Sequence, residues 1–322
     1  MREQKCNNMK NMKKMKEREH AGGQIGILIC AVVFLISSVE WGRTRMQAVR
    51  EADTIAQLAE LTRQDTGSVT QSWPSPQDDF EEGQEKGSSE RKMPDQNLQE
   101  ENFPEQEKDH ETRDYAKLSR LNSDFAGWLW IPGTMVDLPV MNDPGDPQKY
   151  LRKDFFGKSS AGGSLFVAEG CGTESDCLLI YGHNMRNGTM FGSLKCYEKK
   201  EYWETHRWIH FYMPENLCSY EAFAVFRTTV SEPETVFEQE TATGADADAN
   251  AGGQGENFPY YRYAGNLNQE QFQNLIREVR EYACYDTGIV PEYGDQILML
   301  STCSYHAKNG RVVVVARAAK GK

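Results

Sequence analysis

The sequence predicts a mainly β protein: an eight-stranded, closed or nearly closed barrel with a few peripheral helices, preceded by a transmembrane helix and a disordered acidic stalk. Three observations lead to this prediction. A stretch of 19 residues without charge lies near the N-terminus of the 322-residue chain, and a polar, acidic region follows it. The rest of the chain holds eight short runs that are typical of β-strands and are separated by turn-forming residues.

The first 20 residues form a basic tail that we expect to lie in the cytoplasm. Residues 1–50 carry 10 Lys or Arg and 4 Asp or Glu, a net charge of +6. The uncharged residues 21–39 follow, and a helix of this length spans roughly 28 Å, about the thickness of the hydrocarbon core. The basic excess before this segment favours a cytoplasmic N-terminus. We therefore expect a single-pass signal anchor over residues 21–40, with the remainder of the chain outside the cell.

Two other interpretations of this apolar segment stay open, a cleaved secretory signal peptide and a buried helix of a soluble protein. Signal cleavage requires a pair of small residues in the small-x-small pattern just after the apolar run. Residues 36–41 read Ile-Ser-Ser-Val-Glu-Trp and offer no such pair. The uncleaved anchor therefore fits the sequence better than a removed signal.

Residues 41–113 are predicted to form an extracytoplasmic stalk that is mostly disordered. Its first part, residues 43–63, has the partial apolar spacing of an amphipathic helix. Residues 51–114 carry 18 acidic and 6 basic side chains, and such a composition buries too little apolar surface to offset the entropy of ordering. Residues 115–322 are also acidic, with a net charge of −6. This balance argues against a nucleic-acid-binding protein, which needs a basic face.

A folded domain is predicted over residues 114–319. Its strands are expected where short apolar or alternating runs are bounded by Gly, Pro, Asn and Asp. These runs are 128–131, 136–140, 164–167, 177–181, 208–212, 220–227, 296–302 and 311–317. Helices are expected over 114–122, 190–204 and 268–284, the last capped by Asn268. Residues 239–257 are of low complexity and are predicted to be a mobile insertion.

The first candidate site residue is His183, which follows an apolar strand and Gly182. A histidine at a strand end is held by its backbone while its ring stays accessible, which suits a general acid or base near neutral pH. The alternative is a structural role in the loop. His306, three residues after Cys303, is another candidate base, but it falls in a predicted hairpin loop, where a solvated histidine is the better interpretation.

The second candidate site lies in the hairpin formed by the last two apolar runs. If its loop is symmetric about Ala307, Cys303 and Arg311 oppose each other with Cβ atoms about 5 Å apart. A guanidinium favours the thiolate form of a neighbouring thiol, and it can donate to a developing oxyanion. Ser301 shares this strand face by the two-residue period. The alternative is a buried cysteine beside an arginine that merely caps the next strand.

Together these segments resemble the active-site segments of sortases, the membrane-anchored cysteine transpeptidases of Gram-positive bacteria. Sortases carry a Thr-Leu-x-Thr-Cys strand end, and residues 299–303 read Met-Leu-Ser-Thr-Cys, with Met at a position that concerns strand packing. The resemblance is to class B in particular and covers roughly residues 115–317. The segments that carry it are 127–140, 150–155, 181–194 (Tyr-Gly-His-Asn-Met, then Gly-Thr-Met-Phe and Leu) and the helix at 268–284.

The resemblance implies a sortase-type barrel and a cysteine transpeptidase. In this chemistry Cys303 is the nucleophile, His183 the general acid and base, and Arg311 the donor to the oxyanion. Ser301 and Leu151 are carried over as substrate contacts. No metal or organic cofactor is expected.

The same resemblance implies partners. The substrate is the C-terminal sorting signal of a secreted protein, of the Asn-Pro-x-Thr type and cleaved after Thr, and the acceptor is an amine of a peptidoglycan precursor. Two alternatives stay open: a pilin-polymerising sortase that uses a Lys of another subunit, and a catalytically silent surface-binding module on the same fold.

Two further cysteines lie close together in the sequence. Cys171 and Cys177 flank a Gly-rich connection, and in an extracytoplasmic domain they could form a small-loop disulfide. We favour two unpaired thiols, because Cys303 must itself stay reduced to act.

Overall fold

The computed structural model describes residues 49–63, 109–110, 112–230, 258–304, 307 and 309–319, with scattered positions between 34 and 46. By its internal contacts the chain divides into two units, residues 1–54 and 55–322. The described residues of the first unit are helical. Among all described residues, no helix combines the length and the apolar character needed to cross a membrane.

Several predicted segments lie outside the described residues. They are the basic tail 1–20, most of the anchor 21–40, the stalk from 64 to 108, the insertion 239–257, and the alternative base His306.

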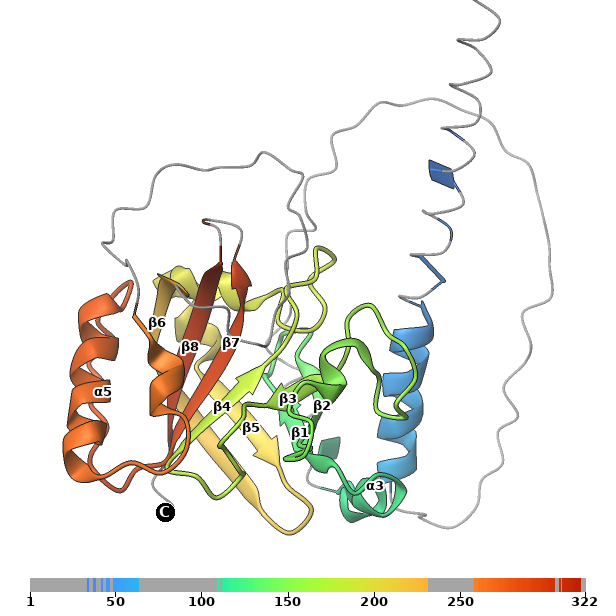
Figure 1. Cartoon of the computed structure of the whole chain (residues 1–322), viewed down its shortest axis with the longest axis horizontal. Helices are drawn as coiled ribbons and strands as arrows, with labels where there is room; N and C mark the ends of the chain where they lie inside the picture. Colours follow the sequence, from blue (N-terminus) through green and yellow to red (C-terminus); the bar gives the residue numbers. More distant parts are fainter. Residues whose placement is uncertain are drawn as a thin grey trace, which may run out of the picture. The chain divides into compact units, whose positions relative to one another are not determined.

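The second unit is built on a closed eight-stranded barrel, as predicted (Figure 1). Its strands are β1 (Phe125–Trp130), β2 (Asp137–Met141), β3 (Leu165–Val167), β4 (Cys177–Tyr181), β5 (Trp208–Tyr212), β6 (Leu217–Thr229), β7 (Ile297–Ser304) and β8 (Gly310–Ala318). Their order around the barrel is β1-β2-β3-β4-β7-β8-β6-β5, and β1 closes on β5. The pairs β2–β3 and β4–β7 are parallel, and the others are antiparallel.

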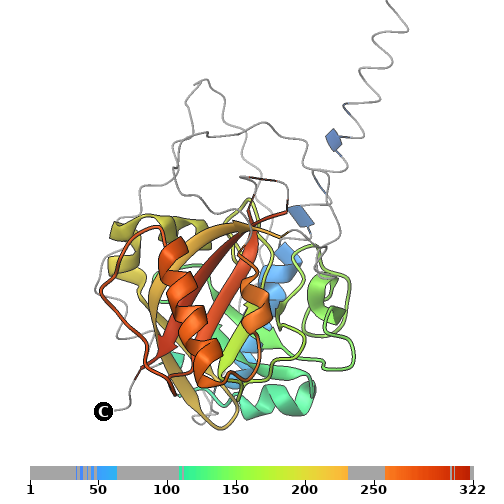
Figure 2. The same ribbon diagram turned by 60° about the vertical axis from the view of Figure 1, so that its left-hand side comes forward.

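Short helices surround the barrel: α3 (Ala116–Leu121), η2 (Lys149–Arg152), η3 (Leu194–Glu198), α4 (Lys200–His206), η4 (Tyr260–Tyr263) and α5 (Gln269–Tyr282). The longest of these, α5, begins where predicted. The Asn268 side chain accepts the backbone N–H of Gln271, and the Gln271 side chain accepts the N–H of Asn268. Its apolar side faces the barrel, and the helix lies alongside β6 and β8 (Figures 1 and 2).

Side chains alternate between two apolar clusters, one on each face of the barrel wall. Leu298 and Val314 belong to the interior cluster, whereas their strand neighbours Met299 and Val315 belong to a second cluster. This second cluster also contains Phe272 of α5, so it covers the outside of the barrel. The alternation therefore assigns every residue of β7 and β8 to the interior or to the outer face.

The folded unit begins earlier than the predicted start of the domain at residue 114. Residues 49–62 are helical, within the predicted range 43–63, but the burial of this helix was not predicted: Leu58 is fully buried in the outer cluster. The carbonyl of Thr62 accepts the N–H of Asp114 at 2.7 Å. Residues 55–63 are therefore part of the barrel unit and not of a free stalk.

The chain just before α3 is fixed to the outside of the barrel by a cluster around His110, which is 2% exposed. Its ring stacks on Trp130 and Tyr212, with centroids 4.5 and 5.2 Å apart. Its Nδ1 lies 2.7 Å from the hydroxyl of Tyr115, and its Nε2 lies 3.4 Å from Oδ1 of Asp137. This region was predicted to be stalk, and the structure places it against β1 and β5.

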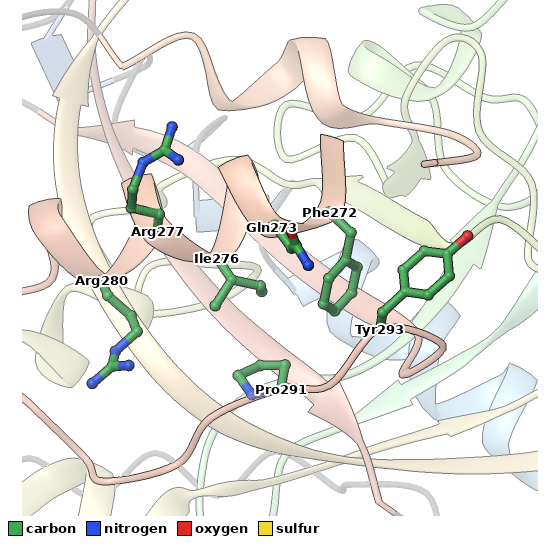
Figure 3. Close-up of a pocket in the computed structure, with 7 residues that line it drawn as sticks. All are labelled: Phe272, Gln273, Ile276, Arg277, Arg280, Pro291 and Tyr293. Atoms are coloured by element: carbon green, nitrogen blue, oxygen red, sulfur yellow. The ribbon is translucent and has the colours of Figure 1, made fainter. Parts of the chain in front are cut away.

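A pocket of about 440 Å³ lies between α5 and the chain that leads into β7 (Figure 3). Figure 3 shows an apolar side formed by Phe272 and Ile276 across from Pro291, with Arg277 and Arg280 along the same helix. Gln273 and Tyr293 complete the lining. None of the predicted site residues lines this pocket, so the chemistry suggested by the sequence belongs elsewhere.

Candidate active site

The hairpin of β7 and β8 has the predicted register. Cys303 of β7 pairs with Arg311 of β8, and Ser301 pairs with Val313. By strand alternation, Cys303 and Arg311 project on the outer face of the barrel, the face of Met299 and Val313. The hairpin therefore brings a thiol and a guanidinium to the same strand end, on the same side of the sheet.

Arg311 sits between two other strands, which limits its freedom. It pairs with Cys303 on one side and with Thr228 of β6 on the other, and it is only 5% exposed. Its Nη1 donates to the carbonyl of Gly310 at 3.1 Å. Cys303 is half-buried. A fixed positive charge beside a thiol favours the thiolate, which is the nucleophilic form.

The parallel pairing of β4 with β7 places His183 beside this pair. Tyr181 is aligned with Ser301, and the N–H of Gly182 donates to the carbonyl of Ser301 at 3.1 Å. Two residues further along the chain are His183, in the loop that follows β4, and Cys303, still within β7. The three predicted catalytic residues therefore lie at the same end of three consecutive strands, β4, β7 and β8, and His183 is half-buried there.

The loop that carries His183 is folded back on itself. The carbonyl of His183 accepts the N–H of Phe191 at 3.0 Å, and Asn184 forms an isolated bridge with Met190. Gly182 is required where the loop leaves the strand. A Cβ atom there would lie 2.5 Å from Leu165 and 2.6 Å from the Phe191 ring, closer than packed carbon atoms approach.

The two predicted substrate contacts are placed differently from the catalytic residues. Ser301 is fully buried, and its hydroxyl lies 2.7 Å from the hydroxyl of Tyr260 on η4. In this structure Ser301 does not reach the surface, so its predicted direct contact with substrate is not supported. Leu151 lies half-buried on η2, packed against the outer cluster.

Cys171 and Cys177 are both free thiols, as we favoured. The thiol of Cys171 donates to the carbonyl of Cys177 at 3.4 Å. Burial raises the pKa of the Cys177 thiol well above its ordinary value, and burial also raises the pKa of Cys171. Both groups are therefore kept in the unreactive thiol form.

Three residues of the site have roles that sequence reasoning did not assign. Thr302 donates its hydroxyl to the carbonyl of Gly182 at 2.7 Å, and the side-chain amide of Asn184 donates to the carbonyl of Cys303 at 2.8 Å. Tyr260 covers Ser301. Asn184 directly follows His183 in the chain, and Thr302 directly precedes Cys303, so their positions in the sequence could have identified them. No feature of the sequence near the site residues indicated Tyr260.

Comparison with known proteins agrees with this geometry. Residues 129–319 match the sortase domain family. The chain is 28% identical over 213 residues to sortase B of Listeria monocytogenes, covering 63% of this chain and 74% of the relative. It is 24% identical over 218 residues to sortase B of Staphylococcus aureus, covering 66% and 77%.

Solved structures show the same fold. The Staphylococcus aureus sortase B–substrate complex matches with a TM-score of 0.53 at 23% identity, over 69% of this chain and 93% of that structure. Sortase B of Clostridium perfringens matches with a TM-score of 0.50 at 25% identity, over 63% and 98%. The family match spans more than half of the chain and includes the strand ends that carry the thiol, the imidazole and the guanidinium. The chain therefore belongs to the sortase family of cysteine transpeptidases, as a class B sortase.

Proposed function

We propose that this protein cleaves a C-terminal sorting signal of the Asn-Pro-x-Thr type after Thr and joins the released protein to an amine of a peptidoglycan precursor. The observation that carries this proposal is the alignment of Cys303 with Arg311 across β7 and β8, with His183 at the end of the adjacent strand β4. Such an arrangement supplies a nucleophile, an oxyanion donor and a proton carrier within one strand end.

In the first half-reaction the Cys303 thiolate attacks the carbonyl carbon of the substrate Thr, and a carbon–sulfur bond forms. The carbonyl oxygen becomes an oxyanion, and the Arg311 guanidinium donates hydrogen bonds to it. The peptide C–N bond then breaks, and the imidazolium of His183 gives its proton to the leaving amine. The product is a thioester between Cys303 and the substrate Thr.

In the second half-reaction the acceptor amine attacks the thioester carbonyl. His183, now neutral, takes a proton from this amine, and a new amide bond forms as the carbon–sulfur bond breaks. The Cys303 thiolate and the His183 imidazolium are restored. The chemistry needs no net oxidation or reduction and returns every group to its starting state.

We also propose that residues 21–40 anchor the protein in the cell membrane with the barrel outside the cell. Sorting-signal proteins leave the cell through this membrane, and membrane-bound acceptor precursors reach its outer face. The basic residues before the apolar segment support this orientation. The anchor would serve the encounter with substrates, while the strand-end residues perform the chemistry.

The test is cleavage of a fluorogenic Asn-Pro-x-Thr-type peptide by the wild-type chain and by Cys303→Ala. We expect Cys303→Ala to abolish both cleavage and the covalent thioester, which intact mass spectrometry detects in the wild-type protein. Cys284→Ala is a matched control, because Cys284 is an exposed thiol outside the site. Cleavage that survives in Cys303→Ala would contradict the proposal.

The same assay separates the acceptors. Adding a peptidoglycan-type peptide amine or a Lys-containing pilin peptide to the reaction gives a transfer product whose mass names the amine that was used. Faster turnover with the peptidoglycan-type amine is expected. A product formed only with the Lys peptide would move this chain to the pilin-polymerising alternative.

A further inference from the structure

The donors of the hydrogen bonds between β4 and β7 change from backbone N–H groups to side chains where the strands reach the proposed active site. Up to Tyr181 and Ser301 the two strands pair as a regular parallel ladder. The last backbone bond of this register runs from the N–H of Gly182 to the carbonyl of Ser301. The next two acceptors of a parallel ladder in this register are the carbonyls of Gly182 and Cys303.

Both of these carbonyls accept side-chain donors. The hydroxyl of Thr302 donates to the carbonyl of Gly182 at 2.7 Å, and the amide of Asn184 donates to the carbonyl of Cys303 at 2.8 Å. In a continued ladder the second of these bonds would come from the backbone N–H of Asn184. The side chain of Asn184 therefore makes the contact that its backbone would make in a longer strand.

The side-chain bond that stands in place of a backbone bond has a geometric consequence for His183. The chain turns away from the sheet after Gly182 and folds back, with Asn184 bridged to Met190. The side-chain amide of Asn184 extends from the turned backbone and still reaches β7. His183, directly before it, therefore lies beyond the last paired residue of β4, while its loop stays bonded to the residue that carries the thiol.

We propose that Asn184 is a positioning residue of the transpeptidase, which holds the imidazole of His183 in register with the thiol of Cys303. This inference rests on the proposed roles of His183 and Cys303. Asn184 touches no reacting atom in this scheme. It acts through the Cys303 carbonyl, and its loss would let the loop move relative to β7 while the barrel itself keeps its packing.

Asn184→Ala removes the donor and tests this role. We expect kcat for the sorting peptide to fall by roughly 10- to 100-fold, because small misplacements of a catalytic group cost this much. KM should stay within about 2-fold, since no substrate contact is removed. Asn184→Gln keeps an amide donor on a longer side chain and should recover a large part of kcat. Asn187→Ala is the matched control, because this exposed asparagine of the same loop bonds to Thr189 and, among the described residues, to none outside the loop.

A second readout excludes a general loss of structure. The rate of Cys303 alkylation by iodoacetamide is measured against pH, with Cys303→Ala giving the background from the other thiols. A displaced imidazolium stabilises the thiolate less, so the midpoint for Asn184→Ala should move up by about 0.5–1 pH unit. Thermal unfolding should shift no more than it does for Asn187→Ala.

Two results would overturn the inference: wild-type kcat in Asn184→Ala, or a loss of kcat with an unmoved alkylation profile. The failure of the proposed function looks different. In that case Cys303→Ala itself would still cleave the peptide, whatever the behaviour of the Asn184 variants.

Discussion

Two polar clusters on the outside of the barrel contain a histidine, and they differ in what their hydrogen bonds connect. Around His110 the contacts join side chains: the imidazole lies beside the Tyr115 hydroxyl and the Asp137 carboxylate. Aromatic rings cover this histidine, which is 2% exposed. Around His183 the bonds described above join side chains or N–H groups to backbone carbonyls, and the residue is half-buried.

This difference separates a structural histidine from the histidine that we propose to act in catalysis. A buried imidazole whose two nitrogens face fixed partners ties segments of chain together and has no room for a substrate. Hydrogen bonds to the backbone instead fix the path of a loop and do not by themselves set the orientation of the imidazole that the loop carries. Substitutions around His183 (Cys303, Arg311 and Asn184) should therefore reduce activity more than stability. Substitutions around His110 (Tyr115 and Asp137) should do the reverse.

The largest effect is expected for Arg311→Lys in the proposed active site. Lys keeps the charge but offers a flexible point donor in place of a planar fork, so donation to the oxyanion is lost. We expect cleavage of the sorting peptide to fall by about 10²–10³-fold. The measurement is kcat/KM for the fluorogenic peptide, after circular dichroism and thermal unfolding show that the variant is folded.

Arg317→Lys is the matched control for this substitution, because Arg317 lies on the same face of the same strand and pairs with Glu221 at 3.2 Å. It should keep near wild-type activity. A near wild-type rate for Arg311→Lys would make Arg311 a structural charge and would remove it from the mechanism.

The opposite pattern is expected for His110→Ala. This change removes a stacked ring and leaves the Tyr115 hydroxyl and the Asp137 carboxylate without their shared partner. Loss of such a buried contact should lower the free energy of unfolding by about 2–4 kcal/mol. The kcat of the folded fraction should stay within about 2-fold, because the cluster lies on β1 and β5 and not at the ends of β4, β7 and β8.

His206→Ala is the control for the loss of unfolding free energy expected in His110→Ala. His206 is a half-buried histidine that stacks on Tyr202 at 4.0 Å, so its substitution also removes a ring stack. It should cost less stability than His110→Ala, since its ring is not enclosed. Equal losses of unfolding free energy in the two variants would contradict the contrast between His110 and His183. A kcat that falls with His110→Ala would contradict it as well.

The sequence predicted the placement of Cys303 and Arg311 far better than that of His110, for a physical reason. The register of Cys303 and Arg311 follows from a short hairpin, in which the loop fixes the pairing of the strands. His110 lies beside a strongly acidic stretch whose composition is typical of disorder, and its partners Trp130 and Tyr212 are distant in the sequence. Tertiary contacts order this segment, and the local sequence pattern does not predict them.

The burial of Ser301 was missed for a similar reason. The two-residue period correctly assigned Ser301 to the face of Cys303. It could not show what covers this face, because Tyr260 comes from η4, 41 residues earlier in the chain. Pattern along a strand therefore predicts the face of a residue, whereas its exposure depends on elements that the strand does not contain.

The smallest expected effect concerns the pH dependence of the structural cluster and is tested by Asp137→Asn. Burial opposes ionisation of Asp137, but the hydrogen bond and charge of His110, the hydrogen bond from Trp128 and the charge of Arg113 outweigh it. The pKa of this carboxyl therefore lies below its ordinary value. A carboxyl with a lowered pKa stabilises the folded state above its unfolded-state pKa, and this contribution disappears as the pH falls through its folded-state pKa.

Unfolding by urea at a series of pH values measures this contribution. Wild type should be more stable than Asp137→Asn near neutral pH, and the difference should shrink below about pH 4, where the carboxyl takes up a proton. In the His110→Ala background the same substitution should have a smaller effect at neutral pH, because residues in contact are energetically coupled. A difference that stays constant from pH 7 to pH 3 would show that Asp137 stabilises the cluster through packing and not through its charge, and the contrast between the two histidines would then rest on burial alone.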